Sequence, residues 1–96
     1  MTSTRPQAKA TLQIENDQVI VTEWSFLPGA ETGWHKHGYD YVIVPGTKGK
    51  LLLETSEGEK TSDLEVGQSY YRPGGAEHNV VNINDYPFSF VEVELK

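Results

Sequence analysis

Three histidines have the spacing in this sequence that could support metal chemistry. His35 and His37 lie two positions apart in Trp34–Val44, a segment rich in β-branched and aromatic residues. Side chains at i and i+2 of a strand point to the same face, so both imidazoles can reach one ion at the ~2.0–2.1 Å metal–nitrogen distance. His78 comes from a separate segment. It would complete a set of three ligands if its strand crosses the same wall.

The segment around His78 reads as a strand, a tight turn and a second strand. Gly67, Pro73, Gly75, His78 and Asn82 follow the spacing Gly-x5-Pro-x-Gly-x2-His-x3-Asn. Proline presets φ and glycine accepts positive φ, so the chain reverses before His78. We interpret the glycines and the proline as turn geometry. Asn82 is expected to hydrogen-bond to backbone rather than to bind a ligand.

The elements that must position these histidines are predicted to be strands throughout. Eight or nine short β-type runs alternate with turn residues, as in a sandwich or small barrel. No segment of ten or more residues has helical periodicity. Residues 1–10 are polar and are expected to form a flexible arm. Residues 11–96 are expected to form a single all-β domain.

Charge and composition limit the classes of partner that the protein is expected to bind. The chain has 96 residues and a net charge of −6, which argues against nucleic acid or an anionic membrane surface as a partner. It has no cysteine, so disulfides and thiolate metal sites are excluded. The N-terminal residues resemble neither a signal peptide nor an anchor, which favours a cytoplasmic location. A domain this small leaves much of its surface exposed, so we expect a homodimer.

Alternation along Phe88–Leu95 predicts which residues face the core. The predicted core-facing set is Ser89, Val91, Val93 and Leu95. Phe88 and Phe90 would then lie on the other face and either cover a dimer interface or cap the barrel end.

An aromatic pocket is expected around the histidines, with about half of the candidates facing inward. These candidates are Trp24, Phe26, Trp34, Tyr39, Tyr41, Tyr70, Tyr71 and Phe90. Arg72 and Glu92 would offer a charged anchor for a small carboxylate or amine, or form a surface ion pair, which is the commoner arrangement.

With these motifs the sequence resembles the cupin family, whose fold is a double-stranded β-helix, or jelly-roll barrel. The first cupin motif begins Gly-x5-His-x-His, which matches Gly29, His35 and His37, with a later glycine at Gly49. The second motif is the spacing described around His78, matched at every position. The resemblance covers Gly29–Asn82, over half of the chain.

Two further segments are similar to a narrower group within the cupins. Trp34–Tyr41 and Phe90–Leu95 resemble small bacterial single-domain cupins, some of which are named for β-alanine degradation.

The sequence departs from the cupin pattern where most metal-binding members place a glutamate ligand. Tyr41 and Val42 occupy that position here, and the nearest carboxylate is Asp40. Parity places Tyr41 on the face of the histidines and Asp40 on the opposite face, unless a bulge intervenes. Three sites remain open: three histidines with water, a site with Tyr41 as fourth ligand or beside a ligand, and a site completed by Asp40.

The resemblance implies a divalent transition metal held by His35, His37 and His78, namely iron, zinc, nickel, manganese or copper. Imidazole ligands suit zinc, copper, iron or nickel. The implied function is a metal-binding cupin acting on a small organic molecule, with dioxygenase- or isomerase-like chemistry. Tyr41 is the candidate acid/base or orienting residue. The alternative is a non-catalytic cupin that binds a metal or small molecule as a sensor or accessory protein.

Overall fold

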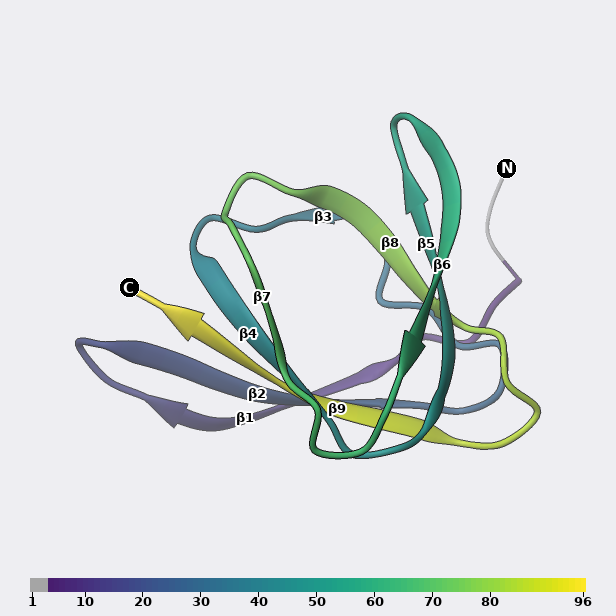
Figure 1. The fold of residues 1–96 in the computed structure, drawn as a ribbon, viewed down its shortest axis with the longest axis horizontal. Coiled ribbons are helices and arrows are strands. Elements are labelled where there is room, and N and C mark those ends of the chain that lie inside the picture. The colour runs from purple at the N-terminus through teal and green to yellow at the C-terminus, as the bar shows by residue number, and fades with distance from the viewer. Residues whose placement is uncertain (1–3) are drawn as a thin grey trace.

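A computed structural model describes residues 4–96, and this part of the chain forms nine strands and no helix (Figure 1). The expectation of eight or nine strands is confirmed. The strands are β1 (Lys9–Glu15), β2 (Val19–Phe26), β3 (His35–Lys36), β4 (Asp40–Pro45), β5 (Gly49–Thr55), β6 (Gly58–Leu64), β7 (Tyr70–Arg72), β8 (Glu77–Asn82) and β9 (Phe88–Leu95). Over the described residues, no helix exists that is long and apolar enough to cross a membrane.

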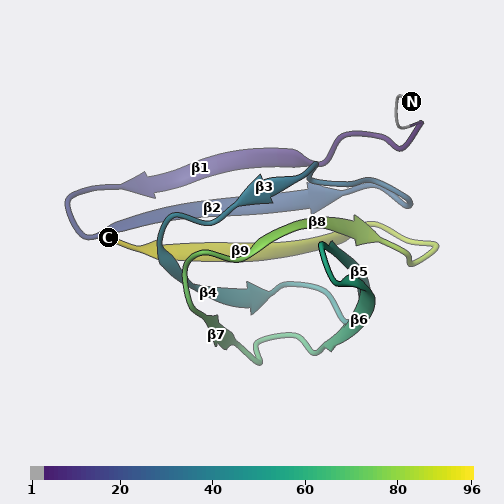
Figure 2. The same ribbon diagram turned by 90° about the horizontal axis from the view of Figure 1, so that it is seen from above.

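The strands form two antiparallel sheets, which Figure 2 shows from above. The larger sheet has the order β1-β2-β9-β4-β7, and the smaller one has the order β3-β8-β5-β6. Neighbours in each sheet are often distant in sequence, because the chain passes repeatedly between the sheets. This topology confirms the all-β double-stranded β-helix. It also brings β3 and β8, which carry the histidines, into direct pairing.

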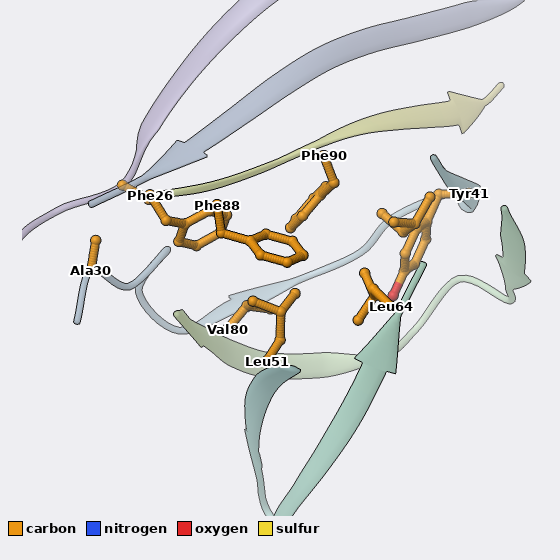
Figure 3. Close-up of a cluster of buried hydrophobic side chains, with 10 residues drawn as sticks. Phe26, Ala30, Tyr41, Leu51, Leu64, Val80, Phe88 and Phe90 are labelled. Carbon is orange, nitrogen blue, oxygen red and sulfur yellow. The ribbon is translucent and has the colours of Figure 1, made fainter. Parts of the chain in front are cut away.

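The core lies between the sheets and combines aromatic with aliphatic side chains (Figure 3). Phe88 is 1% exposed and Phe90 is 5% exposed, so both face the core. Phe88 pairs with Phe26 of β2 across the strand register, and the Phe26 and Phe90 ring centroids lie 5.5 Å apart. The predicted facing of β9 was therefore wrong. Its valines, not its phenylalanines, lie on the outer face.

Backbone hydrogen bonds hold the N-terminal segment against the barrel from Pro6 onward. Ala8 is buried, its N–H donates to the Glu31 carbonyl, and Glu31 N–H donates to the Pro6 carbonyl. β1 then begins at Lys9. The expected flexible arm therefore does not include residues 6–10, which form backbone contacts with the barrel. Residues 1–3 lie outside the described part of the chain.

Asn82, the last residue of β8, is fully buried and holds three backbone carbonyls together. Its amide nitrogen lies 3.4 Å from Phe26 O, 3.3 Å from Leu27 O and 3.0 Å from Tyr86 O. The side chain therefore joins the end of β8 to the end of β2, at Phe26 and Leu27, and to the turn before β9, at Tyr86. The backbone role expected for Asn82 is confirmed.

Candidate metal centre

Three imidazoles converge inside the barrel, next to the smaller sheet. His35 of β3 pairs with His78 of β8 across the register, and His37 follows directly after β3. His37 Nε2 lies 3.1 Å from His35 Nε2 and 3.0 Å from His78 Nε2. Two ligands at right angles on one ion, each at ~2.1 Å, lie about 3.0 Å apart. The three histidines grouped by their spacing are thus brought together with separations that suit one ion.

The outward nitrogens of two of these rings face oxygen atoms. His35 Nδ1 lies 2.8 Å from the Gly33 carbonyl oxygen, which only accepts, so this nitrogen carries the proton. His37 Nδ1 lies 3.5 Å from Glu92 Oε1, and a carboxylate there favours a proton on Nδ1. Both Nε2 atoms then present lone pairs to each other across 3.1 Å. Such lone pairs repel, and a cation between them removes the repulsion. The donor set therefore fits a metal ion.

The turn before β8 fixes the backbone of His37. His37 N–H donates to Ala76 O at 2.9 Å, and Gly75 N–H donates to His37 O at 2.7 Å. Gly75 has a φ of 94°, which favours glycine. A Cβ on Gly74 would lie 2.9 Å from the carbonyl carbon of Tyr39, closer than packed atoms tolerate. The two glycines thus allow the turn to approach the chain that carries His37.

Burial keeps two of the histidines in the ligating form. The pKa of His37 is lowered to about 4, first by burial and then by His35 and His78. The pKa of His78 is also lowered to about 4, by burial and then by the charges of His35 and Lys60. Neutral imidazole is the form that binds a metal, so neither ring must lose a proton at neutral pH.

Glu92 is a buried carboxyl beside the cluster, and sequence reasoning misjudged its position. It is 8% exposed, with Oε1 near His37 Nδ1 and Oε2 3.4 Å from the Trp24 indole nitrogen, which donates to it. Burial, followed by the nearby Glu94, raises the pKa of Glu92 to about 7. The surface ion pair considered for Glu92 and Arg72 is absent from the described residues. Alternation along β9 groups Glu92 with Phe88 and Phe90, but it does not say which of the two faces is inside.

Tyr41 lies on the face of the histidines, as parity predicted, and packs against one of them. Its ring is stacked on His37, with centroids 4.0 Å apart and an interplanar angle of 23°. Burial raises the pKa of Tyr41 to about 12, and the Glu92 charge adds to this effect. The phenol therefore keeps its proton at neutral pH. This state favours a place beside His37 over the role of a phenolate ligand.

Asp40 points to the opposite face and is held there. Its Oδ2 accepts from the Tyr71 hydroxyl at 2.5 Å, and its Oδ1 accepts from Gly74 N–H at 2.8 Å. The hydrogen bond from Tyr71, then that from Gly74, lowers the pKa of Asp40. Asp40 does not belong to the histidine cluster, so the structure does not support the site completed by this carboxylate.

A cavity of about 350 Å³ extends from the histidines toward solvent. Its apolar wall includes Ile43, Leu51, Leu53, Val80 and Phe90. About half of the predicted aromatic lining is present.

Trp24, Tyr41, Tyr70 and Phe90 line the cavity. Trp34, Tyr39 and Tyr71 are exposed and lie elsewhere. For Tyr39 the reason is that β3 ends at Lys36, so the alternation predicted through Trp34–Val44 is interrupted before β4. Trp34 and Tyr71 each precede a residue that lines the cavity, His35 and Arg72, and therefore point the other way.

Fold and site together define a jelly-roll barrel with an internal three-histidine cluster, and known proteins agree with this description. Residues 22–94 match the family described as Cupin domain. A curated relative, the β-alanine degradation protein BauB of Pseudomonas aeruginosa, is 57% identical over 94 residues, covering 98% of this chain and 99% of the relative. The chain belongs to the cupin family.

Two further relatives align with different shares of this chain. The crystal structure of a cupin domain from Bordetella pertussis Tohama I has a TM-score of 0.96 and 59% identity, over 99% of both chains. A glucose-6-phosphate isomerase of Pyrococcus furiosus is 43% identical over 54 residues, which are 55% of this chain but only 28% of that enzyme. The first similarity covers the whole barrel, and the second is confined to part of it.

Proposed function

We propose that this cupin binds a divalent transition metal through His35, His37 and His78 and acts on a small organic molecule in the adjoining cavity. The observation that carries the proposal is the convergence of three Nε2 atoms at 3.0–3.1 Å, two of them with their other ring nitrogen facing an oxygen. Imidazole ligands suit iron, zinc, nickel or copper, whereas manganese prefers oxygen ligands. When bound, such an ion would supply Lewis-acid or redox chemistry at its open positions.

The residues around the cluster have distinct proposed roles. Tyr41 covers one face of His37 and, with its proton retained, acts as an orienting residue or a hydrogen-bond donor. The hydrophobic wall excludes water from the inner part of the cavity. The similarity to a protein named for β-alanine degradation supports a role in the metabolism of a small metabolite.

Metal analysis of the untagged protein tests this proposal. We expect close to one transition-metal ion per chain after loading, and loss of that ion in His35→Ala, His37→Ala and His78→Ala. Lys36→Ala, between two of the histidines but exposed, is the control and should retain the ion. Failure of the wild-type protein to take up any divalent ion would contradict the proposal.

The second candidate is binding without turnover. The absence of a carboxylate from the cluster favours it, because three neutral imidazoles leave the bound ion without the anionic ligand of most metal cupins. Oxygen consumption and isomerisation assays with diketones, thiols, catechols and sugar phosphates separate the two. Ligand binding without turnover in every metal form would select the binding module.

A further inference from the structure

We propose that Arg72 and Lys60 form an anion subsite at the mouth of the cavity, and that the ligand of the three-histidine site is a small carboxylic acid. The inference rests on the proposed function, because a second oxygen of the same molecule would reach the bound ion. The two residues belong to β7 and β6, which are edge strands of the two opposing sheets. The subsite therefore lies between the edge of the larger sheet and the edge of the smaller sheet.

Arg72 faces the interior from the larger sheet. It pairs across the register with Tyr41, whose side chain lies in the core. Its guanidinium carbon lies 4.6 Å from the centroid of the Tyr70 ring, and Nη1 donates to the Tyr71 carbonyl at 3.0 Å. These contacts orient the guanidinium without neutralising it.

Lys60 faces the interior from the smaller sheet. It pairs with Leu53, which packs against the core, and both residues line the cavity. By contrast, Lys50 on the neighbouring strand forms an ion pair with Asp63. Neither Lys60 nor Arg72 has an ion-pair partner within residues 4–96.

Acidic groups also border the cavity, so their positions must be considered in deciding whether the ligand is an anion or a cation. Glu57 lies at the tip between β5 and β6, Glu77 is exposed at the start of β8, and Glu92 is buried behind His37. None of them neutralises Arg72 or Lys60. In a chain of net charge −6, an anion is repelled unless cations receive it locally. The guanidinium fork matches a carboxylate in particular.

The cavity limits the size of this acid. About 350 Å³ is near the lower end for small-molecule pockets, which suits a compact metabolite. Such a ligand would place its carboxylate at Arg72 and Lys60. A carbonyl, hydroxyl or second carboxyl oxygen would then face the open positions of the histidine site.

To test the proposal, the cobalt-loaded protein is titrated with malonate, succinate and glutarate. Binding is measured by calorimetry and by changes in the visible cobalt spectrum. Acetate, malonamide and propylamine serve as comparison compounds, because each lacks either the second carboxylate or all negative charge. We expect at least one dicarboxylate to bind about tenfold or more tightly than acetate. Arg72→Gln should remove that preference while retaining the cobalt content and the unfolding temperature.

Matched variants separate local charge from net charge. Lys60→Gln should weaken the dicarboxylate several-fold, whereas Lys50→Gln, with the same charge change at a paired lysine, should not. Arg72→Lys should restore part of the affinity, because it keeps the charge but loses the fork. Unchanged dicarboxylate affinity in Arg72→Gln, or tighter binding of propylamine than of any acid, would overturn the inference.

Failure of metal binding gives a different result from failure of the subsite. The chain has two arginines, Arg5 and Arg72, so the side-chain Nε–H resonance of Arg72 is assigned by its loss in Arg72→Gln. This resonance should shift on addition of a dicarboxylate even to the metal-free protein. A protein that takes up no cobalt yet shows the shift would refute the proposed metal function alone. A protein that binds cobalt but shows no shift would refute the carboxylate subsite alone.

Discussion

Glu92 is a buried carboxyl that lies beside His37, the histidine at the centre of the cluster. Its two oxygens face His37 and Trp24, so its position depends on both β9 and β2. A carboxylate on the far nitrogen of a ligating histidine commonly fixes the tautomer and orientation of the ring. At this scale the site consists of three ligands and the carboxyl that orients one of them.

The first prediction concerns the pH dependence that Glu92 gives to the metal-free protein. Its folded-state pKa of about 7 exceeds the ordinary value of 4.5, so the folded state binds more protons between these pH values. Stability from this residue is therefore complete below about pH 4.5 and is lost as pH rises through 7. We compare the free energy of unfolding of Glu92→Gln with that of wild type at pH 4.5 and at pH 8. The difference should move in favour of the variant by roughly 2–3 kcal/mol between the two pH values, since one pKa unit is about 1.4 kcal/mol.

Urea unfolding of the metal-free proteins at a series of pH values measures this difference. Glu65→Gln is the control, because Glu65 pairs with Lys48 on the surface and should show little change. A constant difference between Glu92→Gln and wild type from pH 4.5 to 8 would mean that Glu92 titrates as an exposed carboxyl.

At the scale of elements, the turn between β7 and β8 determines how close the two cupin motifs come. Gly74 lies against the Tyr39 backbone, whereas a Cβ on Gly38 would meet nothing within 4 Å. We expect Gly74→Ala to displace the turn from His37 and weaken metal binding by about tenfold, with a loss of stability of about 1–3 kcal/mol. Gly38→Ala should change metal affinity by less than twofold. Competition with a chromogenic chelator measures both; equal affinities would show that the turn does not set the position of His37.

The N-terminal segment reaches the histidine site through a chain of polar contacts. Arg5 forms ion pairs with Glu31 and Glu54 at 3.1 and 3.0 Å, and both carboxylates accept from the Asn79 amide. Asn79 Oδ1 in turn accepts from Gly33 N–H at 2.9 Å, and the Gly33 carbonyl is the oxygen that faces His35 Nδ1. The segment before β1 thus supports one ligand from a distance.

The third prediction follows from this chain of contacts. We expect Arg5→Ala to weaken metal binding by about three- to tenfold, less than the 10–100-fold typical of direct neighbours of a ligand. Lys96→Ala is a matched control, because Lys96 forms an ion pair with Glu15 through an exposed surface. Isothermal titration with zinc provides the affinities. Equal losses in the two variants would attribute the effect to net charge rather than to the contacts.

At the scale of the whole molecule, the outer face of the larger sheet carries a group of valines. The phenylalanines of β9 face the core, so the alternate residues Val91 and Val93 lie outside, next to Val44 and Val42 of β4. All four valines are partly exposed. The sheet face spans about 27 Å along β2 and about 19 Å across four strands, or about 500 Å² in projection.

The fourth prediction is that two copies of the chain associate through this valine face. Light scattering after size-exclusion chromatography should give a dimer for wild type. Val93→Lys should shift the equilibrium to monomer, and Lys9→Ala at the edge of the same sheet should not. A monomeric wild-type protein at tens of micromolar would contradict the prediction, as would a Val93→Lys variant that folds and remains a dimer.

Most of the fold and the histidine cluster were predictable because they depend on local signals. Turn residues separated the strands, and the spacing of His35, His37 and His78 carried over directly into the structure. The facing of β9 was not predictable in the same way, because both of its faces are apolar and alternation alone cannot say which one is inside. Its buried Glu92 made the inner face look like the solvent face.

Contacts between distant segments account for the remaining differences. Tyr39 lies outside the cavity because strand geometry is interrupted at His37, where the backbone bonds to the turn around Ala76. The contacts of Arg5 with Glu54 join segments that only the finished topology brings together. Neither feature leaves a periodic signal in the sequence.

The contacts that connect Arg5 to His35 make the segment before β1 a reporter of the site. Thermodynamic linkage is reciprocal, so if Arg5 strengthens metal binding, a bound ion must strengthen the hold on the segment by the same free energy. The chain contains no cysteine, so Thr4→Cys would carry a single thiol for a fluorescent dye. Occupancy of a centre buried inside the barrel would then be read optically at its surface, without any probe entering the cavity.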